Sequence, residues 1–187
     1  ASRLLARHAS YRHTCRLQDY RDVQSQFDGI VSIEMFEAVG ERYWDAYFQT
    51  LARCLKPKGR AVIQTITIDE RLFARYRRGT DFIQRYIFPG GMLPSSAEFE
   101  KYAKHHGLQI EDRFAFGQDY ARTLSEWARK FDSQRSEIER LGFDENFQRM
   151  WRFYLLGSAA GFRSRGLQLW QVVMRRRGVA PLYEPVR

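Results

Sequence analysis

The sequence predicts an α/β domain built around one sheet, with helices inserted late in the chain. Two observations support this prediction. Short apolar, β-branched segments alternate with longer segments of helical periodicity, and turn residues separate the two kinds. Between residues 29 and 67, a strand, a helix, a Pro-Gly turn and a second strand follow one another, as in a βαβ unit with a right-handed crossover. The sequence therefore predicts a parallel sheet.

The expected strands are short runs rich in apolar and β-branched residues. They cover residues 14–17, 29–33, 60–67, 108–116 and 167–174. Strand 29–33 follows the turn-forming pair Phe27-Asp28 and is almost wholly apolar, which is typical of a buried strand. The turn Lys56-Pro57-Lys58-Gly59 is expected to end a helix and to lead into the next strand.

The expected helices carry apolar residues at helical spacing. They cover residues 41–55, 96–106, 123–140 and 145–157. The apolar face of the first consists of Tyr43, Ala46, Tyr47, Thr50, Leu51 and Leu55. Ser95 has the character of an N-cap, and Gly107 is expected to end the second helix. The irregular segment 68–96 and the helical segment 123–162 are expected to form a lid, and residues 175–187 a basic tail.

Composition narrows the class of protein. The chain has 187 residues, of which 44% are hydrophobic, and this excludes disorder over most of its length. Its 31 Lys and Arg residues against 22 Asp and Glu residues give a net charge of +9, which favours a polyanionic partner. Cys15 and Cys54 are too few for a disulfide framework, and no uncharged apolar run is long enough for a membrane helix.

The first residues, Ala-Ser-Arg-Leu-Leu-Ala-Arg, contain no apolar core of a secretory signal and no initiator Met. We therefore expect the chain to be a piece of a longer protein.

Several catalytic motifs are absent from the sequence. It contains no Gly-x-Gly-x-x-Gly, no phosphate-binding Gly-x-x-x-x-Gly-Lys and no Gly-x-Ser-x-Gly elbow. The four histidines, His8, His13, His105 and His106, show no metal-ligand spacing, so we expect no metal site. These absences argue against P-loop enzymes, hydrolases of the elbow type and zinc enzymes.

Polar clusters follow three of the expected strands, at the edge where open α/β sheets bind ligands. The first, Gln18-Asp19-Tyr20, suits a nucleotide base or sugar; the alternative is an Asx-type loop with a packed tyrosine. The second places Glu34 and Glu37 among Met, Phe and Val residues. A carboxylate in such surroundings has a specific partner or a raised pKa, or it caps the following helix.

The third cluster contains Gly117 and Tyr120. Gly117 permits an unusual backbone angle, and Tyr120 is placed to point inward. The alternative is a structural tyrosine with one backbone hydrogen bond.

Five ordered segments together resemble the cyclopropane-fatty-acyl-phospholipid synthases and their mycolic-acid and branched-fatty-acid methyltransferase relatives. These segments are Leu17-Gln18-Asp19-Tyr20-Arg21-Asp22, Phe27-Asp28-Gly29-Ile30-Val31-Ser32-Ile33-Glu34-Met35-Phe36-Glu37, Tyr86-Ile87-Phe88-Pro89-Gly90-Gly91, Asp119-Tyr120-Ala121-Arg122-Thr123-Leu124 and Leu167-Gln168-Leu169-Trp170-Gln171-Val172-Val173. The resemblance runs from about residue 10 to residue 177.

The resemblance implies a class I, Rossmann-like methyltransferase that uses S-adenosylmethionine. Such enzymes methylate a cis double bond of an acyl chain, and proton loss from the resulting cation closes a cyclopropane ring. Related members make methylated or methylene-branched chains instead. The family holds a bicarbonate ion as the general base, and the segments 68–96 and 123–162 would form the acyl pocket.

Residue roles follow from the resemblance by position. The side chains that support the bicarbonate ion map onto Glu37, Gln64 and Tyr120, and Ile66 would add a backbone contact. The family has His where this chain has Gln64, and Gln donates a hydrogen bond but carries no positive charge. This difference favours the branched-chain subgroup as the second reading. The cofactor contacts map onto Gln18, Asp19, Tyr20 and Ile33, with Asp19 expected to accept from the adenine amino group.

Aromatic faces would stabilise a cationic intermediate in a dry pocket. The candidates for this role are Tyr76, Tyr86, Phe88, Phe116, Tyr154 and Phe162.

The Gly-rich cofactor loop and the ribose-binding acid of the family have no counterpart in this chain. We therefore expect the N-terminal strands of the sheet to be missing, and the chain to be the C-terminal part of the catalytic domain. By itself it would bind cofactor poorly and would be inactive. One sheet edge would be open to a second copy, as in a homodimer.

The expected partners are an anionic phospholipid membrane surface and an unsaturated acyl chain, with the protein cytoplasmic and peripheral at the inner face of the membrane. A nucleic-acid-binding module is the alternative from another class, but the arginines are dispersed rather than gathered in one stripe, and we expect no nucleic acid. A small-molecule methyltransferase of the same fold is the nearer alternative.

Overall fold

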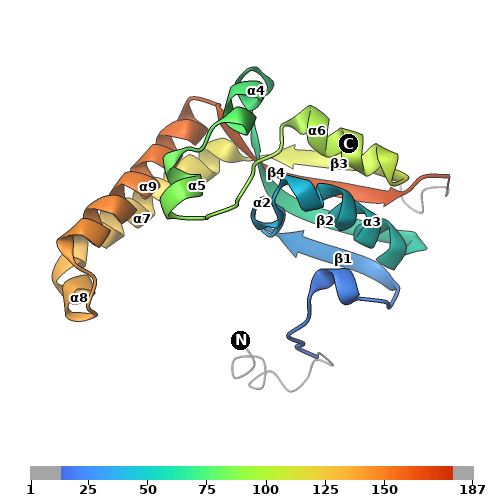
Figure 1. Ribbon diagram of the computed structural model, residues 1–187, viewed down its shortest axis with the longest axis horizontal. Helices are drawn as coiled ribbons and strands as arrows, with labels where there is room; N and C mark the ends of the chain where they lie inside the picture. The colour runs from blue at the N-terminus through green and yellow to red at the C-terminus, as the bar shows by residue number, and fades with distance from the viewer. Residues whose placement is uncertain (1–13, 179–187) are drawn as a thin grey trace.

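A four-stranded sheet forms the centre of the computed structural model, which describes residues 14–178 (Figure 1). Its strands are β1 (Phe27–Ile33), β2 (Leu55–Ile68), β3 (Leu108–Ala115) and β4 (Leu167–Arg176), in the order β1-β2-β4-β3. β1 and β2 are parallel, whereas β4 is antiparallel to both β2 and β3. The expectation of one sheet is confirmed, but the expectation of a wholly parallel sheet is wrong.

The reversed strand has a simple cause in the connection that precedes it. α7 (Gly117–Ser133) leaves the end of β3, the short α8 (Arg135–Arg140) turns the chain, and α9 (Glu145–Arg163) returns beside α7 (Figure 1). The chain thus comes back to the end of the sheet that it left. β4 must then run in the opposite direction to pair with its neighbours.

The remaining described helices are shorter than α7 and α9. They are η1 (Tyr20–Asp22), α2 (Phe36–Val39), η2 (Glu41–Tyr43), α3 (Trp44–Cys54), α4 (Glu70–Arg78), α5 (Phe82–Tyr86) and α6 (Ser96–His105). Helix α6 confirms the expected boundaries, because the Ser95 side chain caps it by accepting from the N–H of Glu98 and Gly107 follows in a left-handed conformation. Among residues 14–178, no helix combines the length and apolar character needed to cross a membrane.

Several expected boundaries are wrong. Residues 14–17 form no strand, and Lys56–Gly59 belong to β2 instead of forming a separate turn. Phe27 pairs with Leu55 but Gly29 pairs with Arg60, so the four residues between are accommodated as an irregularity inside the strand. β4 extends to Arg176, so part of the predicted basic tail is strand; residues 179–187 lie outside the described part of the chain.

α7 begins at Gly117, although this segment was expected to be a loop before a helix at residue 123. Gly117 does not have a positive φ, so the expected unusual backbone angle is wrong. The glycine is instead needed for a close approach. A Cβ there would lie 2.4 Å from Oε1 of Gln168, the atom that accepts the Gly117 N–H.

The main core lies between the sheet and the helices α3 and α6, which cover one of its faces (Figure 1). Five aromatic side chains interlock there at ring separations of 4.8–5.6 Å: Phe36, Trp44, Tyr47, Phe48 and Phe99. Tyr47 and Leu51 confirm part of the predicted face of α3. Trp44 and Phe48 are buried where Tyr43 and Thr50 were expected.

A second core joins α7 to α9 and to β4. Its fully buried members are Ala121, Leu124, Ala128, Leu155, Ala159, Phe162 and Leu169. The small residues Ala121, Ala128 and Ala159 let the two helices approach closely along their shared face. We refer to α7, α8 and α9 together as the arm. The arm extends away from the sheet (Figure 1). Its helices confirm the expectation that residues 123–162 are helical.

Candidate functional site

The site begins where β1 stops and β2 continues. The last paired residues of the two strands are Ile33 and Gln64, and the N–H of Glu34 still donates to the Gln64 carbonyl at 2.9 Å. Glu34 has a φ of +50°, a left-handed conformation that is uncommon for a residue other than glycine. This backbone turn directs the chain away from the sheet and into the short helix α2.

Glu37, in the first turn of α2, extends the hydrogen bonding of β2 with its side chain. Its Oε1 accepts the backbone N–H of Ile66 at 2.5 Å, an amide that has passed the end of β1. Its Oε2 is buried and has no hydrogen-bond partner among residues 14–178. Burial raises the pKa of the Glu37 carboxyl above its ordinary value, although the Ile66 N–H acts in the opposite direction.

A chain of polar contacts crosses the sheet beside Glu37. Gln171 of β4 donates to Oε1 of Gln64 at 2.9 Å, and Gln64 donates through Nε2 to the Glu34 carboxylate at 2.7 Å. The hydroxyl of Tyr120, on α7, donates to the other oxygen of Glu34 at 3.4 Å. Two elements, β2 and α7, thus place a donor on one carboxylate, and β4 orients the first of these donors.

A cavity of about 190 Å³ opens next to these carboxylates. Glu34, Glu37, Ile66 and Tyr120 contribute to its wall. The rest of the wall is mainly apolar or aromatic and includes Tyr76, Ile83, Phe88, Met92, Leu93, Leu124, Tyr154, Phe162 and Leu167. Residues from both expected lid segments therefore enclose it. Of the six aromatic candidates, Tyr76, Phe88, Tyr154 and Phe162 line the cavity, whereas Tyr86 and Phe116 do not.

The tyrosines of the cavity are held in their neutral form. Burial raises the pKa of Tyr120 well above its ordinary value, and the negative charge of Glu34 adds to this effect. The same two causes raise the pKa of Tyr154. Burial raises the pKa of Tyr76 to about 12, and its oxygen accepts the N–H of Leu93 at 3.2 Å. At neutral pH the site thus offers hydroxyl donors rather than phenolate anions.

The expected site residues separate into two groups. Glu37, Ile66 and Tyr120 meet at the cavity, and Gln64 lies next to it through its bond to Glu34. The expected cofactor residues, Gln18, Asp19, Tyr20 and Ile33, are not part of the cavity wall. They precede it in the chain or, for Ile33, stand on β1 directly before Glu34.

Asp19 has local partners in this structure. Its carboxylate caps η1 by accepting the N–H of Arg21, and it forms an ion pair with the same residue at 2.7 Å. The Arg21 side chain lowers the pKa of Asp19 to about 2. Tyr20 packs edge-on against Tyr47, whose hydroxyl donates to Ser32 on β1. The Asx-type loop with a packed tyrosine is thus present, and cofactor binding there stays a prediction.

Two residues of the site were not predicted as site residues. Glu34 was expected either to have a specific partner or to cap the following helix. The N-cap of α2 is Met35, and the Glu34 side chain has Gln64 and Tyr120 as partners, so the first interpretation is confirmed. Gln171 carried only a weak signal, a polar residue inside an apolar strand. Its role becomes visible through the register that pairs it with Gln64.

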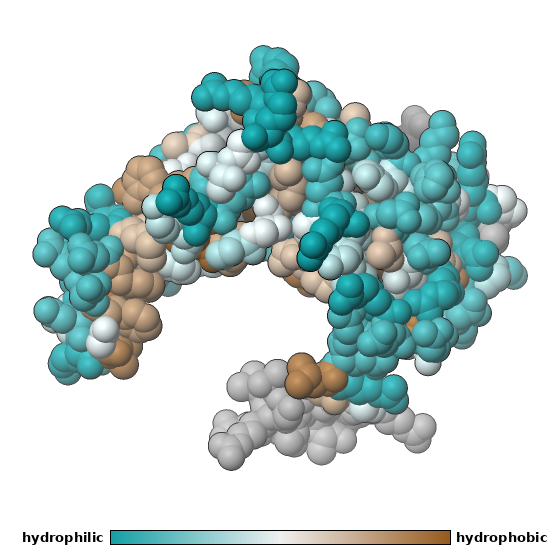
Figure 2. All heavy atoms as spheres, in the orientation of Figure 1, coloured by the Kyte–Doolittle hydropathy of each residue, from teal (hydrophilic) through white to brown (hydrophobic). Residues whose placement is uncertain are grey.

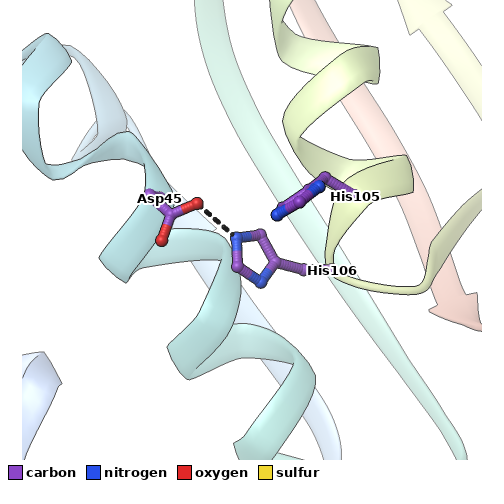
Figure 3. Close-up of side chains that lie close together, drawn as sticks. All are labelled: Asp45, His105 and His106. Atoms are coloured by element: carbon purple, nitrogen blue, oxygen red, sulfur yellow. Dashed lines mark hydrogen bonds and ion pairs between the residues drawn. The ribbon is translucent and has the colours of Figure 1, made fainter.

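One cluster elsewhere has the chemistry of a metal site. Asp45 of α3 lies next to His105 and His106 at the end of α6, with the ligand atoms of the three within 4.8 Å of one another (Figure 3). The His106 Nε2 atom is 2.8 Å from Asp45 Oδ1, so the pair already ties α3 to α6 without a metal. The spacing of the histidines could not reveal this cluster, because Asp45 comes from another helix.

Comparison with known proteins gives matches over most of the chain. The family model described as mycolic acid cyclopropane synthetase matches residues 2–172. The chain is 43% identical over 177 residues to the tuberculostearic acid methyltransferase UfaA1 of Mycobacterium tuberculosis (strain ATCC 25618 / H37Rv). It is 41% identical over 168 residues to the cyclopropane-fatty-acyl-phospholipid synthase of Escherichia coli (strain K12). These matches cover 94% and 87% of this chain but only 42% and 41% of the two relatives.

Solved structures show the same fold. The cyclopropane synthase MmaA2 from Mycobacterium tuberculosis is 26% identical with a TM-score of 0.77, over 91% of this chain and 64% of that one. The mycolic acid cyclopropane synthase CmaA1, solved with SAH and CTAB, is 26% identical with a TM-score of 0.81, over 94% of this chain and 66% of that one. A putative sarcosine dimethylglycine methyltransferase from Galdieria sulphuraria, 20% identical with a TM-score of 0.69, shares the fold alone. The expected methyltransferase fold is confirmed.

Proposed function

Since the chain belongs to the mycolic acid cyclopropane synthetase family, we propose that it transfers a methyl group from S-adenosylmethionine to the cis double bond of an unsaturated phospholipid acyl chain. The product would be a cyclopropane fatty acid. The observation that carries this proposal is the cavity, because it combines an apolar, aromatic wall with the carboxylates of Glu34 and Glu37, which both follow β1 in the chain. An acyl chain needs the apolar wall, and the acid–base step needs the carboxylates.

The residues of the cavity suit a cationic intermediate. The faces of Phe88, Tyr120 and Tyr154 attract positive charge, and an apolar wall excludes the water that would capture a cation. Glu34 and Glu37 add negative charge at one end of the same space. These groups bind and position the acyl chain and stabilise the charge that develops on it.

S-adenosylmethionine, when bound, supplies the methyl group. Its adenine amino group would donate a hydrogen bond to the carboxylate of Asp19. Ile33 is 63% exposed on β1 and would offer an apolar surface to the ring. Gln18 and Tyr20 complete the set of side chains that we assign to this cofactor. An acceptor and an apolar contact suit the adenine ring, so these residues support binding of the adenine end of the cofactor only, and Asp19 would share its oxygens with Arg21.

A methylated or methylene-branched product is the second candidate. The observation that favours it is Gln64, which bonds to a carboxylate of the site where the family has a histidine. The relative UfaA1, a tuberculostearic acid methyltransferase, has 43% identity to this chain, which supports the same reading.

The test is the lipid composition of bacteria that express the complete gene product. Cells grown on methyl-deuterated methionine should contain acyl chains that carry one labelled carbon, and mass spectrometry before and after hydrogenation separates cyclopropane from methylene products. A Glu37→Ala variant serves as the control. Unchanged acyl chains in cells that make the folded protein would refute the lipid assignment.

We also propose that the protein acts at an anionic membrane surface, peripheral to the inner face of the membrane. The net charge of +9 attracts anionic headgroups. Figure 2 shows apolar side chains gathered on the arm, and those with exposed side chains include Leu141, Phe143, Phe153 and Leu156. Flotation with anionic vesicles should recover the protein, and flotation with neutral vesicles at the same salt concentration should not. A DNA fragment at that salt concentration should show no binding in a gel-shift assay.

Association of two copies is a further part of this proposal. Among residues 14–178, β1 pairs with β2 only, and its Val31 and Ile33 side chains are exposed. Light scattering after size-exclusion chromatography measures the mass directly. Isothermal titration of this 187-residue chain with S-adenosylmethionine should give weak binding, and a micromolar dissociation constant would contradict this expectation.

A further inference from the structure

The groups that the family resemblance assigns to a bicarbonate ion already have carboxylate partners in this chain. Gln64 donates to the Glu34 carboxylate at 2.7 Å, and Tyr120 donates to its second oxygen at 3.4 Å. The N–H of Ile66 donates to Glu37 at 2.5 Å. A bicarbonate ion would have to displace these contacts and lie directly beside two carboxylates. Like charges so close together repel each other. The residues present therefore do not fit the ion.

The position of Glu34 is fixed from several sides. Gln171 donates to the oxygen of Gln64, so the Gln64 amide must present its NH₂ group to Glu34. The Glu34 backbone N–H is bound to the carbonyl of the same Gln64 at 2.9 Å. The left-handed backbone at Glu34 is thus maintained by contacts at both its backbone and its side chain, and unusual conformations of this kind gather at functional sites.

We propose that the carboxylate of Glu34 is the general base of the reaction and takes the place of a bicarbonate ion. The inference rests on the proposed function, because it names the base for that reaction. Glu34 lines the cavity, so its oxygens can reach a substrate there. Gln64 and Tyr120 act as positioning residues that hold the carboxylate in its orientation.

The proton balance of the step is complete within the site. Methyl transfer leaves a positive charge on the acyl chain. Glu34 removes a proton from the added methyl carbon, and the electron pair of the broken C–H bond forms the third C–C bond of the cyclopropane ring. For a methylene-branched product, a 1,2-hydride shift first moves the positive charge to the carbon that carries the added methyl group, and the same electron pair then forms the C=C bond instead. Glu34 leaves the step as a neutral acid and returns its proton to water.

The hydrogen-bond donors around Glu34 remain donors throughout this step. Tyr120 stays protonated because burial and the Glu34 charge raise its pKa. The Gln64 amide does not titrate. Neither group therefore competes with Glu34 for the proton.

Two substitutions at Glu34 separate the roles of charge and space. Glu34→Gln keeps the shape and removes the base, so we expect turnover to fall by about 100-fold or more. Glu34→Gly empties the same space, and glycine tolerates the left-handed backbone without strain, so this variant should fold. Sodium bicarbonate should then restore much of the activity of Glu34→Gly but none of the activity of Glu34→Gln. Glu139→Gln, an exposed position on α8, is the matched control with unchanged turnover.

A binding measurement provides a readout that is independent of activity. Isothermal titration with sodium bicarbonate should show no binding to the wild-type protein and measurable binding to Glu34→Gly. In the complete gene product, wild-type turnover should be the same in bicarbonate-depleted and bicarbonate-supplemented buffer.

The inference and the proposed function fail in different ways. An active wild-type enzyme that requires bicarbonate, or a Glu34→Gln variant with full turnover, would overturn the role of Glu34 and leave the lipid activity standing. A folded wild-type protein with no methyl transfer to lipid would overturn the proposed function itself.

Discussion

The carboxylate of Glu37 accepts the backbone N–H of Ile66 at 2.5 Å, so a side chain of α2 satisfies an amide of β2 that lies beyond the end of β1. This contact ties the segment after β1 to the centre of the sheet. It also fixes the position of the second carboxylate oxygen, which is buried without a partner among residues 14–178.

Two substitutions of Glu37 should separate the effect of its hydrogen bond on stability from the effect of its charge. Glu37→Ala leaves the Ile66 N–H without an acceptor, and we expect a loss of about 1–3 kcal/mol in the free energy of unfolding. Glu37→Gln keeps an acceptor oxygen and removes a buried charge, so at neutral pH it should be at least as stable as the wild type. Urea denaturation measures both, and equal stability of Glu37→Ala and Glu37→Gln would contradict the role of the contact.

The stability contributed by Glu37 should depend on pH in a defined direction. Burial raises its pKa above the ordinary value of 4.5, so the folded protein retains a proton that the unfolded chain has released. The wild type should therefore lose stability relative to Glu37→Gln as the pH rises from 4.5 through the pKa of the folded state. Denaturation at a series of pH values tests this, and a constant difference between the two proteins would show that burial does not shift the group.

Gly59 should tolerate no side chain. A Cβ there would lie 2.8 Å from the Asp28 carbonyl oxygen and 3.0 Å from that of Phe27, and backbone atoms do not move aside easily. Gly59→Ala should cost about 1–3 kcal/mol of stability. Gly29→Ala, where no atom lies within 4 Å of the added carbon, is the matched control. Similar thermal midpoints for the two variants would be inconsistent with the irregular pairing of β1 and β2.

The arm offers two neighbouring leucines with different surroundings. Leu155 is 3% exposed in the core between α7 and α9, whereas Leu156 is 37% exposed. Leu155→Ala should destabilise the protein by about 2–5 kcal/mol, because it leaves a cavity, and Leu156→Ala by much less. Chemical denaturation of the two variants provides the comparison, and the opposite order would mean that the arm packs differently.

The sequence revealed most of the fold because local signals and tertiary structure agree there. The apolar run 29–33 lies within β1, and the N-cap at Ser95 and the glycine at residue 107 bracket α6. The direction of β4 could not be read in this way. It depends on the number of helices that separate it from β3, and the start of α7 at Gly117 was hidden by residues typical of a loop.

The site was predicted in part for a similar reason. Glu37 and Tyr120 follow the strands β1 and β3, and this placement is visible in the sequence. The expectation that the strand before Glu37 is buried is wrong, because Val31 and Ile33 are 68% and 63% exposed. The partners of Glu34 are determined by the registers of β1, β2 and β4 and by the return of the chain through α7. Such long-range placement leaves no signal in the local sequence, so Glu34 could equally have been a helix cap.

The two ends of the arm lie close together in the fold. The N–H of Phe116, directly before α7, donates to the carbonyl of Leu169, shortly after α9, at 3.0 Å. The helices of the arm thus leave the sheet after Phe116, and the chain returns to the sheet beside the same residue, where β4 begins at Leu167. The arm can therefore be exchanged as a unit, since a helical pair of another length or sequence joins the same two strands without altering their register. In this architecture, the part of the apolar cavity wall that the arm supplies can diverge or be engineered while Glu34 and Glu37 stay in place after β1.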